Sequence, residues 1–453
     1  MNREARRIFA AALAAADPGP AVKRNLVLRG ERLLAGGREY RLDAFNRLLV
    51  VGGGKAAVPM GAAVEEILGD RISGGLLVTR RGASGLLSRI ALARGSHPLP
   101  DEEGLRAALE ILEIARSADE RTLVLCLLSG GASALLAAPA PGLALEDKQA
   151  VTGLLLRSGA SIDELNAVRK HLSLLKGGRL ARAAHPAAML TLVLSDVIGD
   201  RLDVIASGPT APDASTFADA AAVIAMYGLW PQLPARAAAY LRRGLQGLEA
   251  ETVRQDDPCF AGATHVVVGC LSLALDAAAA LAADLGFRVE VVSRELQGEA
   301  RDAARWLAAR ALRARAGLRA GERLCLLSGG ETTVTVRGNG RGGRNQELAL
   351  AFAMEIATAK GITLLSAGSD GVDGPTAAAG AWVDGGTVKT ARDAGLVAGD
   401  YLANNDSFSF FHELDMRTGL GTHVKTGPTG TNVMDIQVIL LGGVAPAGRE
   451  AET

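Results

Sequence analysis

The chain has 453 residues, which is more than one ordinary hydrophobic core covers and predicts two or three domains. Its 49 lysines and arginines balance 49 aspartates and glutamates, and neither sign forms a long run. A nucleic-acid or membrane-surface partner would need a basic patch, so this balance argues against both kinds of partner. No stretch approaches the roughly 18 consecutive apolar residues of a membrane span.

The first residues predict an amphipathic helix that ends before Pro18. Their charged start and short apolar run also resemble a signal peptide, but Glu4 lies among the arginines and the apolar residues are mostly alanines. The four cysteines are scattered without metal or disulfide spacing, which is typical of a reducing compartment. We therefore expect a cytoplasmic protein.

Short apolar runs alternate with Ala- and Leu-rich helical patterns through the first half of the chain. This alternation predicts βαβ units, with parallel sheets covered by helices. The pattern loosens between 211 and 262, which predicts a boundary near 240–262 and domains at 1–250 and 251–453. Strands are expected at 47–51, 75–79, 122–128 and 190–195. One helix is expected to end at Leu68, a second to extend from about Leu105 to Ser117, and a long helical region to extend from Asp147 to about Ala184.

A second βαβ series follows the boundary, so the expected fold is α/β with mainly parallel sheets in both domains. Its strands are expected at 265–269, 287–292, 324–330, from 362, and near 436–442. Helices are expected to end near Leu285, 316 and Lys360.

Five polar loops follow apparent strands, and the phrase LCLLSGG occurs in two of these places, at 125–131 and 324–330. Ligands of open α/β sheets bind beyond the carboxyl ends of the strands. Glycine turns can hold phosphates with backbone N–H groups, and aspartates can hold a divalent cation. The loops therefore predict a polyanionic ligand. The candidate binding residues are Gly52, Gly53, Gly54, Ser129, Gly130, Gly131, Ser133, Ser328, Gly329, Gly330 and Glu331.

Each of these signals has a plainer interpretation. GGGK lacks the spacing of a Walker A motif, so it is also explained by a tight turn with a solvated Lys55. A G-x-G-x-x-G match at 338–343 suggests a dinucleotide, but arginines lie in and beside it, at Arg341 and Arg344. These arginines indicate an anion or an exposed loop. Aspartates after strands are often helix caps or turn residues, and a rigid loop explains His97 as well as catalysis does.

Several longer blocks together resemble the class II glycerate 2-kinases, whose C-terminal module is called MOFRL. The resemblance extends in order from about residue 5 to 442. It implies a larger Rossmann-like N-terminal α/β domain, a C-terminal MOFRL-type α/β domain, and an active site in the cleft between them. The blocks are GGGKAA, GSHPLPDE, LLSGGASALL, NAVRKHLSLLKGGRLA, LSDVIGDRLDVIASGPTAPD, LSGGETTVTVRGNGRGGRNQELALA, SAGSDGVDGPTAAAGA and TGPTGTNVMD.

The resemblance implies transfer of the ATP γ-phosphoryl group to the 2-hydroxyl of D-glycerate, with Mg²⁺ or another divalent cation. The family's active-site lysine falls on Lys55, and its arginine falls in RGGRNQE, where we choose Arg344 over Arg341 and keep Arg341 as a binding residue. We interpret Asp196 as the acceptor of the hydroxyl proton, and Asp370 and Asp373 as metal ligands.

Two other functions remain open. Members of this family have often been labelled hydroxypyruvate reductases, so an NAD(P)H-dependent reductase is the alternative enzyme. A non-catalytic sensor of sugar acids or nucleotides is the alternative binding protein, and the number of charged loops argues against it. The sequence leaves open whether the protein forms a homo-oligomer.

Overall fold

The computed structural model describes residues 1–443, and the chain divides into two compact units. The N-terminal unit is Pro18–Val268, and the C-terminal unit is Met1–Asp17 together with the chain from Gly269 onward. These units differ from the predicted ranges 1–250 and 251–453 in two ways. The first helix belongs to the C-terminal unit, and the strand after the predicted boundary belongs to the sheet of the N-terminal unit.

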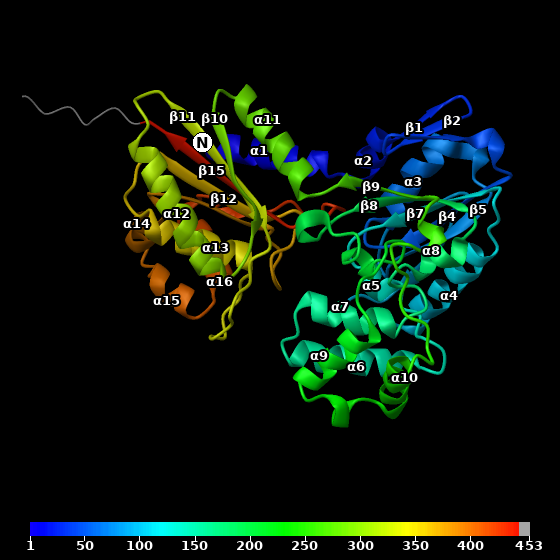
Figure 1. Ribbon diagram of the computed structural model, residues 1–453. Helices are drawn as coiled ribbons and strands as arrows, with labels where there is room; N and C mark the ends of the chain where they lie inside the picture. Colours follow the sequence, from blue (N-terminus) through cyan, green and yellow to red (C-terminus); the bar gives the residue numbers. More distant parts are fainter. Residues whose placement is uncertain (444–453) are drawn as a thin grey trace, which may run out of the picture. The chain divides into compact units, whose positions relative to one another are not determined.

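A six-stranded sheet forms the core of the N-terminal unit, with strand order β6-β5-β4-β7-β8-β9 (Figure 1). The neighbours from β6 to β8 pair in parallel, which confirms the expected βαβ organisation. A separate antiparallel sheet, β1-β2-β3, was not expected from the sequence. The strands are β1 Leu26–Arg29, β2 Arg32–Ala35, β3 Arg38–Arg41, β4 Arg47–Gly53, β5 Gly74–Arg80, β6 Ala91–Gly95, β7 Thr122–Leu128, β8 Ala188–Leu194 and β9 Ala263–Gly269.

The helical region expected from Asp147 to Ala184 is three helices rather than one. Gly159, Gly177 and Gly178 have positive φ in the breaks, a conformation that glycine adopts without strain. A capping box of Ser161 and Glu164 begins the second of these helices. The unit's helices are α2 Pro18–Asn25, α3 Ala57–Leu68, α4 Glu102–Arg116, α5 Ala132–Leu135, α6 Leu145–Arg157, α7 Ile162–His171, α8 Arg179–Ala184, α9 Phe217–Met226 and α10 Ala235–Leu245.

Four of these helices, α6, α7, α9 and α10, form a bundle with its own hydrophobic core beside the sheet (Figure 1). Phe217 is fully buried in this core and packs against the rings of His171 and Tyr240. The bundle places α7 and the chain after it next to the loops that follow β7 and β8.

The sheet of the C-terminal unit is mixed rather than mainly parallel, with order β10-β11-β15-β12-β13-β14. Among the described strands of this sheet, only β10 and β11 pair in parallel, because β15 lies between β11 and β12 and is antiparallel to both. An apolar run does not encode strand direction, so the sequence could not show this. The strands are β10 Arg288–Leu296, β11 Arg323–Gly330, β12 Ile362–Gly368, β13 Gly380–Asp384, β14 His423–Val424 and β15 Asp435–Gly442.

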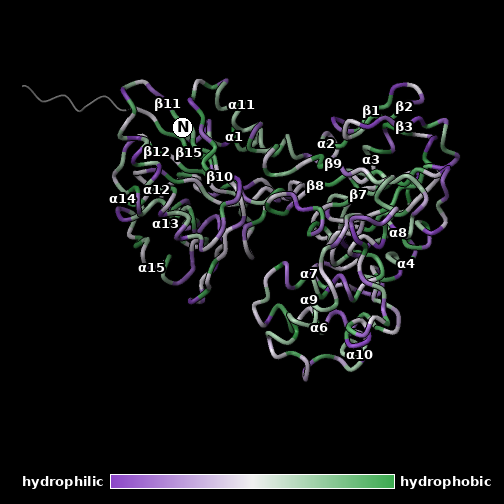
Figure 2. Tube along the Cα trace, in the orientation of Figure 1, coloured by the Kyte–Doolittle hydropathy of each residue, from purple (hydrophilic) through white to green (hydrophobic). Residues whose placement is uncertain are grey.

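The first helix packs against α11 and β12, which explains why it belongs to the C-terminal unit. It ends at Ala15, as expected, and Glu4 contacts Arg323 at the start of β11. The apolar strands and helices of both units are visible as hydrophobic segments in Figure 2. The unit's helices are α1 Asn2–Ala15, α11 Leu271–Asp284, α12 Ala300–Ala316, α13 Arg344–Glu355, α14 Thr387–Asp393, α15 Ala398–Ala403 and α16 Ser407–Thr418.

Two glycine-to-alanine substitutions in the helical bundle should have opposite effects on stability. A Cβ at Gly244 of α10 would overlap the ring of Phe217, so Gly244→Ala should lower the free energy of unfolding by about 1–3 kcal/mol. A Cβ at Gly153 of α6 would meet only the flexible end of Arg157, so Gly153→Ala should raise it by about 0.5–1 kcal/mol. Urea unfolding followed by circular dichroism measures both. Equal effects of the two substitutions would contradict the packing described here.

Candidate active site

The loops after β4 and β7 are joined by backbone hydrogen bonds in the N-terminal unit. The N–H of Lys55 donates to the carbonyl of Gly130 at 2.9 Å, and the N–H of Ser129 donates to the carbonyl of Gly53 at 3.2 Å. The hydroxyl of Ser129 accepts from the N–H of Ala56 at 3.1 Å. Hydrogen bonds therefore hold the predicted loops at 52–55 and 129–133 against each other.

Glycine is required at two positions where these loops meet other groups. Gly54 has a φ of 141°, and a Cβ there would overlap the hydroxyl of Ser129. A Cβ at Gly130 would overlap the carboxylate of Asp196, which follows β8. Close packing thus explains both glycines, and it places Asp196 against the loop that carries Gly130.

Lys55, His97 and Asp196 surround this pair of loops. A Cβ at Gly131 would lie 3.0 Å from His97 Cδ2 and 3.3 Å from Lys55 Cγ. Burial raises the pKa of Asp196, although the charge of Lys55 opposes this shift. Burial lowers the pKa of His97, and the charges of Lys55 and Arg80 lower it further. The cluster combines a cation, a histidine that favours its neutral form, and a carboxylate with an increased affinity for protons.

Ser133 is attached to a group of residues that the sequence prediction did not include. Its hydroxyl lies 2.9 Å from the hydroxyl of Ser207, and its carbonyl accepts from Lys176 at 2.9 Å and from Arg169 at 3.4 Å. Arg169 and Lys176 belong to NAVRKHLSLLKGGRLA, one of the blocks that carry the family resemblance. Their place in that block was the sign in the sequence that could have included them among the candidate residues.

Arg344, at the start of α13 in the C-terminal unit, is held by two carboxylates. Its guanidinium donates to both oxygens of Asp435, at 2.6 and 3.1 Å, and pairs with Glu331 at 2.8 Å. Burial lowers the pKa of Arg344, but the hydrogen bonds and charge of Asp435 outweigh burial, and the net shift is upward. Asp435 begins β15 and was not singled out from the sequence, although it ends the quoted block TGPTGTNVMD.

The two predicted metal ligands have different environments. Asp373 is buried, and its carboxylate accepts from the N–H groups of Asn345 and Gln346 at 3.0 and 2.9 Å, at the start of α13. Burial raises the pKa of Asp373 to about 6. This geometry favours a capping role for Asp373 over metal ligation, because helix donors occupy its oxygens. Asp370 is less buried, and its carboxylate accepts from the nearby N–H of Val372 at 3.1 Å.

These residues could hold a divalent cation only if a substrate supplied some of its ligands. Within residues 1–443, no three His, Cys, Asp or Glu side chains are grouped so that they could hold a metal by themselves. Mg²⁺ is commonly bound through one or two carboxylates together with substrate phosphates and water. Asp370 fits that pattern, and Asp373 does not.

The predicted turn after β11 is mainly part of the sheet. Ser328 is buried and its hydroxyl donates to the side chain of Gln437 at 3.0 Å. Cβ atoms at Gly329 and Gly330 would overlap Leu271 and the carbonyl of Leu296, respectively. These contacts explain the second SGG turn without a ligand, whereas Glu331 is exposed beside Arg344.

The glycine-rich loop at 338–343 is packed against another loop, at 404–407. Cβ atoms at Gly338 and Gly340 would overlap Asn404, and one at Gly342 would overlap Ser407. The N–H of Arg341 donates to Asp406 at 2.8 Å, and its exposed guanidinium lies 4.9 Å from the centre of the Phe408 ring. Two glycines of the dinucleotide-like match, Gly338 and Gly340, are therefore explained by contact between two loops, and a Cβ at the third, Gly343, would overlap Asp373.

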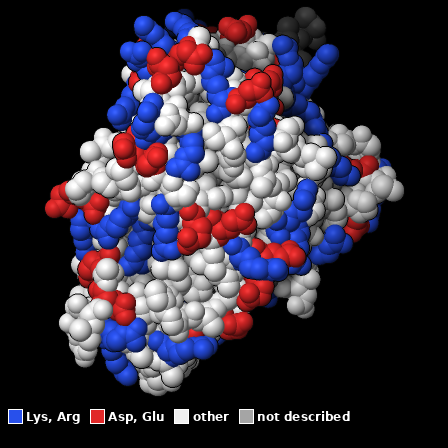
Figure 3. Space-filling model, turned by 90° about the vertical axis from the view of Figure 1, so that its right-hand side faces the viewer, with Lys and Arg blue, Asp and Glu red and all other residues white. Residues whose placement is uncertain are grey.

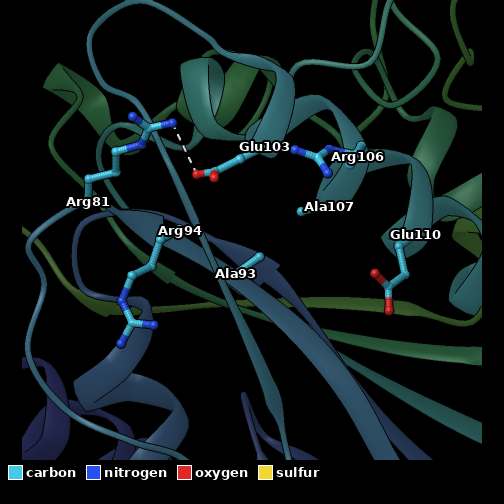
Figure 4. A pocket seen from close by; sticks show the side chains of 7 residues that line it. All are labelled: Arg81, Ala93, Arg94, Glu103, Arg106, Ala107 and Glu110. Atoms are coloured by element: carbon cyan, nitrogen blue, oxygen red, sulfur yellow. Dashed lines mark hydrogen bonds and ion pairs between the residues drawn. The ribbon is translucent and has the colours of Figure 1, made fainter.

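A separate hollow of about 650 Å³ lies beside α4 and the edge strand β6, and it contains none of the predicted site residues (Figure 4). Its arginines are Arg81, Arg94 and Arg106, and Arg81 forms ion pairs with Asp101 and Glu103. On the face shown in Figure 3, basic and acidic side chains are interspersed. In the described part of the chain, no helix combines the length and apolar character needed to cross a membrane.

The two units together define an α/β protein whose N-terminal loops bring Lys55, His97 and Asp196 close to one glycine turn. Comparisons with known families agree with this class. The profile of the MOFRL family matches residues 324–435, and that of a domain of unknown function, DUF4147, matches residues 4–242.

Related proteins identify the family more closely. A D-glycerate 2-kinase from Thermotoga maritima is 42% identical over 87% of this chain and 91% of its own length. The crystal structure of a Thermotoga maritima glycerate kinase has a TM-score of 0.84 and 39% identity, and covers 97% of this chain and 99% of that one. A relative from Agrobacterium vitis, 43% identical over 96% of this chain and 94% of its own length, is named provisionally as a hydroxypyruvate reductase. The chain belongs to the class II (MOFRL-type) glycerate 2-kinase family.

The two aspartates predicted as metal ligands can be separated by substitution. Asp373→Asn places an amide N–H₂ against helix donors and should lower the free energy of unfolding by about 1–3 kcal/mol. Asp370→Asn, which disturbs no helix cap, should change it by less than about 0.5 kcal/mol. Thermal and urea unfolding measure both effects. If Asp373→Asn left stability unchanged, the capping role of Asp373 would be rejected.

Proposed function

We propose that this chain is an ATP-dependent kinase that phosphorylates the 2-hydroxyl of D-glycerate, giving 2-phospho-D-glycerate and ADP. Membership of the glycerate 2-kinase family supports the substrates and the reaction. The observation that carries the proposal for this chain is the joined pair of loops, where Lys55 and Asp196 approach the same glycine turn. A cation and a base close together are what transfer to a hydroxyl requires.

In the proposed mechanism, Lys55 and the turns at 52–54 and 129–131 hold phosphate oxygens. Phosphoryl transfer depends mainly on positioning and on neutralising charge, which a lysine beside backbone N–H groups provides. Asp196 accepts the proton of the 2-hydroxyl as the hydroxyl oxygen bonds to the γ-phosphorus of ATP, while the bond from that phosphorus to the bridging oxygen breaks and ADP leaves. A raised pKa suits this role, because it makes Asp196 a stronger base than an exposed aspartate.

Arg344 is proposed to stabilise charge on the transferred group. Asp435 holds two of its nitrogens, so the guanidinium has a fixed orientation before any substrate binds. The nitrogen that pairs with the exposed Glu331 is the one available for exchange with a phosphate oxygen. We infer that Glu331 holds this donor in place until a phosphate replaces it. The predicted approach of Arg344 to Lys55 across a cleft stays a prediction.

Asp370 is the residue proposed to hold Mg²⁺ together with the phosphates of ATP. A bound Mg²⁺ neutralises phosphate charge during transfer. Nucleotide contacts at Ser328, Gly329 and Gly330 receive less support, because the sheet already accounts for these residues.

The reductase alternative has less support, because Gly338 and Gly340 of the dinucleotide-like match pack against the loop at 404–407 and Gly343 packs against Asp373. A dinucleotide site needs its glycines to approach a pyrophosphate, and these glycines approach other parts of the protein instead. A sensor without catalysis would not need a buried base beside a cation, which is the arrangement of Asp196 and Lys55.

One assay distinguishes the three functions. ATP, Mg²⁺ and D-glycerate should give ADP and 2-phosphoglycerate, identified by coupled assay and by NMR of the product. NADH or NADPH with hydroxypyruvate is the control and should not be oxidised. Nucleotide oxidation without ADP formation would favour the reductase, and binding of D-glycerate without either reaction would favour the sensor.

Substitutions test the proposed roles of the site residues. Lys55→Ala and Arg344→Ala should each lower kcat/KM by about 100-fold or more, since each removes a donor to developing charge. Asp196→Asn should lower kcat by a similar factor and remove the decline in kcat at low pH that protonation of the base causes. Lys23→Ala, which removes an exposed lysine paired with Glu66, is the control. A loss below about threefold, worth ~0.7 kcal/mol, would reject the role of the substituted residue.

A further inference from the structure

A cluster of hydrogen-bonded polar side chains surrounds Ser133, just after the glycine turn at 129–131. We call Ser133, Asn166, Arg169, Lys176 and Ser207 the Ser133 pocket. Lys176 Nζ donates to the carbonyls of Ser133 and Ala206, at 2.9 and 3.4 Å, and Arg169 donates to the carbonyl of Ser133 at 3.4 Å. Two cations thus converge on one carbonyl group.

Neither cation of the Ser133 pocket has an acidic partner among the described residues. Lys176 is only 1% exposed, and its hydrogen bonds and those of Arg169 end on backbone carbonyls. Lys170, next to Arg169, is paired with Asp213 and Asp203. Burial lowers the pKa of Lys176 strongly, and the charges of Arg169, Lys148 and Lys170 lower it further. A buried cation is costly without a counter-charge, so a bound anion would relieve this pocket.

Asn166 supplies an independent observation. It is 3% exposed, its Oδ1 accepts from the hydroxyl of Ser207 at 3.0 Å, and its Nδ2 has no partner in the described part of the chain. Asn166 and Arg169 are three residues apart on α7, so they share one face of the helix. A buried amide without a partner indicates a ligand that accepts hydrogen bonds.

The backbone beside Ser207 is also in an unusual conformation. Ala206 and Ser207 have φ values of 55° and 61°, which side-chain-bearing residues rarely adopt. Such conformations persist where the surroundings enforce them, and they are frequent at ligand sites. Here the conformation directs the hydroxyl of Ser207 to Ser133 and Asn166.

We propose that the Ser133 pocket binds the carboxylate of the hydroxy-acid substrate. This inference rests on the proposed kinase function and assigns the residues that select an acid over a neutral alcohol. Ser133 follows Gly130 by three residues, so their Cα atoms are at most roughly 11 Å apart. Because Asp196 lies against Gly130, a small acid can reach the base with its hydroxyl and the pocket with its carboxylate. Lys55 and the glycine turns at 52–54 and 129–131 are then available to bind phosphate.

Asn166→Asp is the sharpest test of the pocket. The new carboxylate keeps the acceptor for Ser207 and supplies Arg169 and Lys176 with a counter-charge, so the variant should fold and melt at least as high as the wild type. It should also repel the substrate carboxylate. We expect the KM for D-glycerate to rise about 100-fold or more, while the KM for ATP stays within threefold.

A second pair of variants separates binding from folding. Arg169→Gln removes a partly exposed cation with a single backbone contact and should raise the KM for D-glycerate at least tenfold. Lys148→Met is the control, because Lys148 is a buried cation that donates to the backbone carbonyls of Leu172 and Arg169, yet makes no contact with Ser133. This control should retain the wild-type KM for D-glycerate.

The outcomes are distinguishable. An unchanged KM for D-glycerate in Asn166→Asp overturns the proposal, and a rise in the KM for ATP alone overturns it by assigning the pocket to a phosphate. If the wild type formed no ADP with D-glycerate, the kinase function would fail, and calorimetry with D-glycerate alone would test the pocket. Binding by the wild type that is lost in Asn166→Asp supports the pocket. Binding that is equal in both proteins, or absent from the wild type, overturns it.

Discussion

The N-terminal site depends on the hydrogen bonds that join the loops after β4 and β7. These bonds fix the backbone of Lys55 to Gly130 and that of Gly53 to Ser129, so two neighbouring parallel strands end in one rigid structure. Parallel strands make this arrangement natural, because their carboxyl ends lie at the same edge of the sheet. Asp196, from the next strand along, reaches the same edge. Asp196 and Lys55 are thus positioned by sheet topology.

The sequence predicted those parts of the fold that apolar periodicity encodes. The α/β class and the main strands were expected, and β7 matches its predicted range, 122–128. Strand direction was not encoded, so the antiparallel position of β15 could not be foreseen. Short strands with charged residues, such as β6, were also missed, because an edge strand lacks a continuous apolar run.

The same limit applies to the candidate site. Lys55 and Asp196 could be proposed because they follow strands directly, where ligands of α/β sheets bind. Asn166 and Lys176 lie in one of the blocks of the family resemblance, but nothing in that block singles them out, because their relevance depends on buried contacts with Ser133 and Ser207, which are distant in the sequence. Conversely, Gly330 and Gly338 looked like ligand-binding glycines, and the structure gives them neighbouring backbone instead. Glycine content indicates a close approach but does not identify the approaching group.

The two units present opposite electrostatic conditions to an anion. In the N-terminal unit, Arg169 and Lys176 donate to backbone carbonyls, and no carboxylate within residues 1–443 competes with an anion for their N–H groups. In the C-terminal unit, Arg344 is already matched by Asp435 and Glu331. Burial raises the pKa of Asp435, and the charge of the nearby Asp370 raises it further, so that cluster has an excess of acid. A phosphate would approach this cluster favourably only with a divalent cation, and this charge balance supports the proposal that Asp370 acts with Mg²⁺.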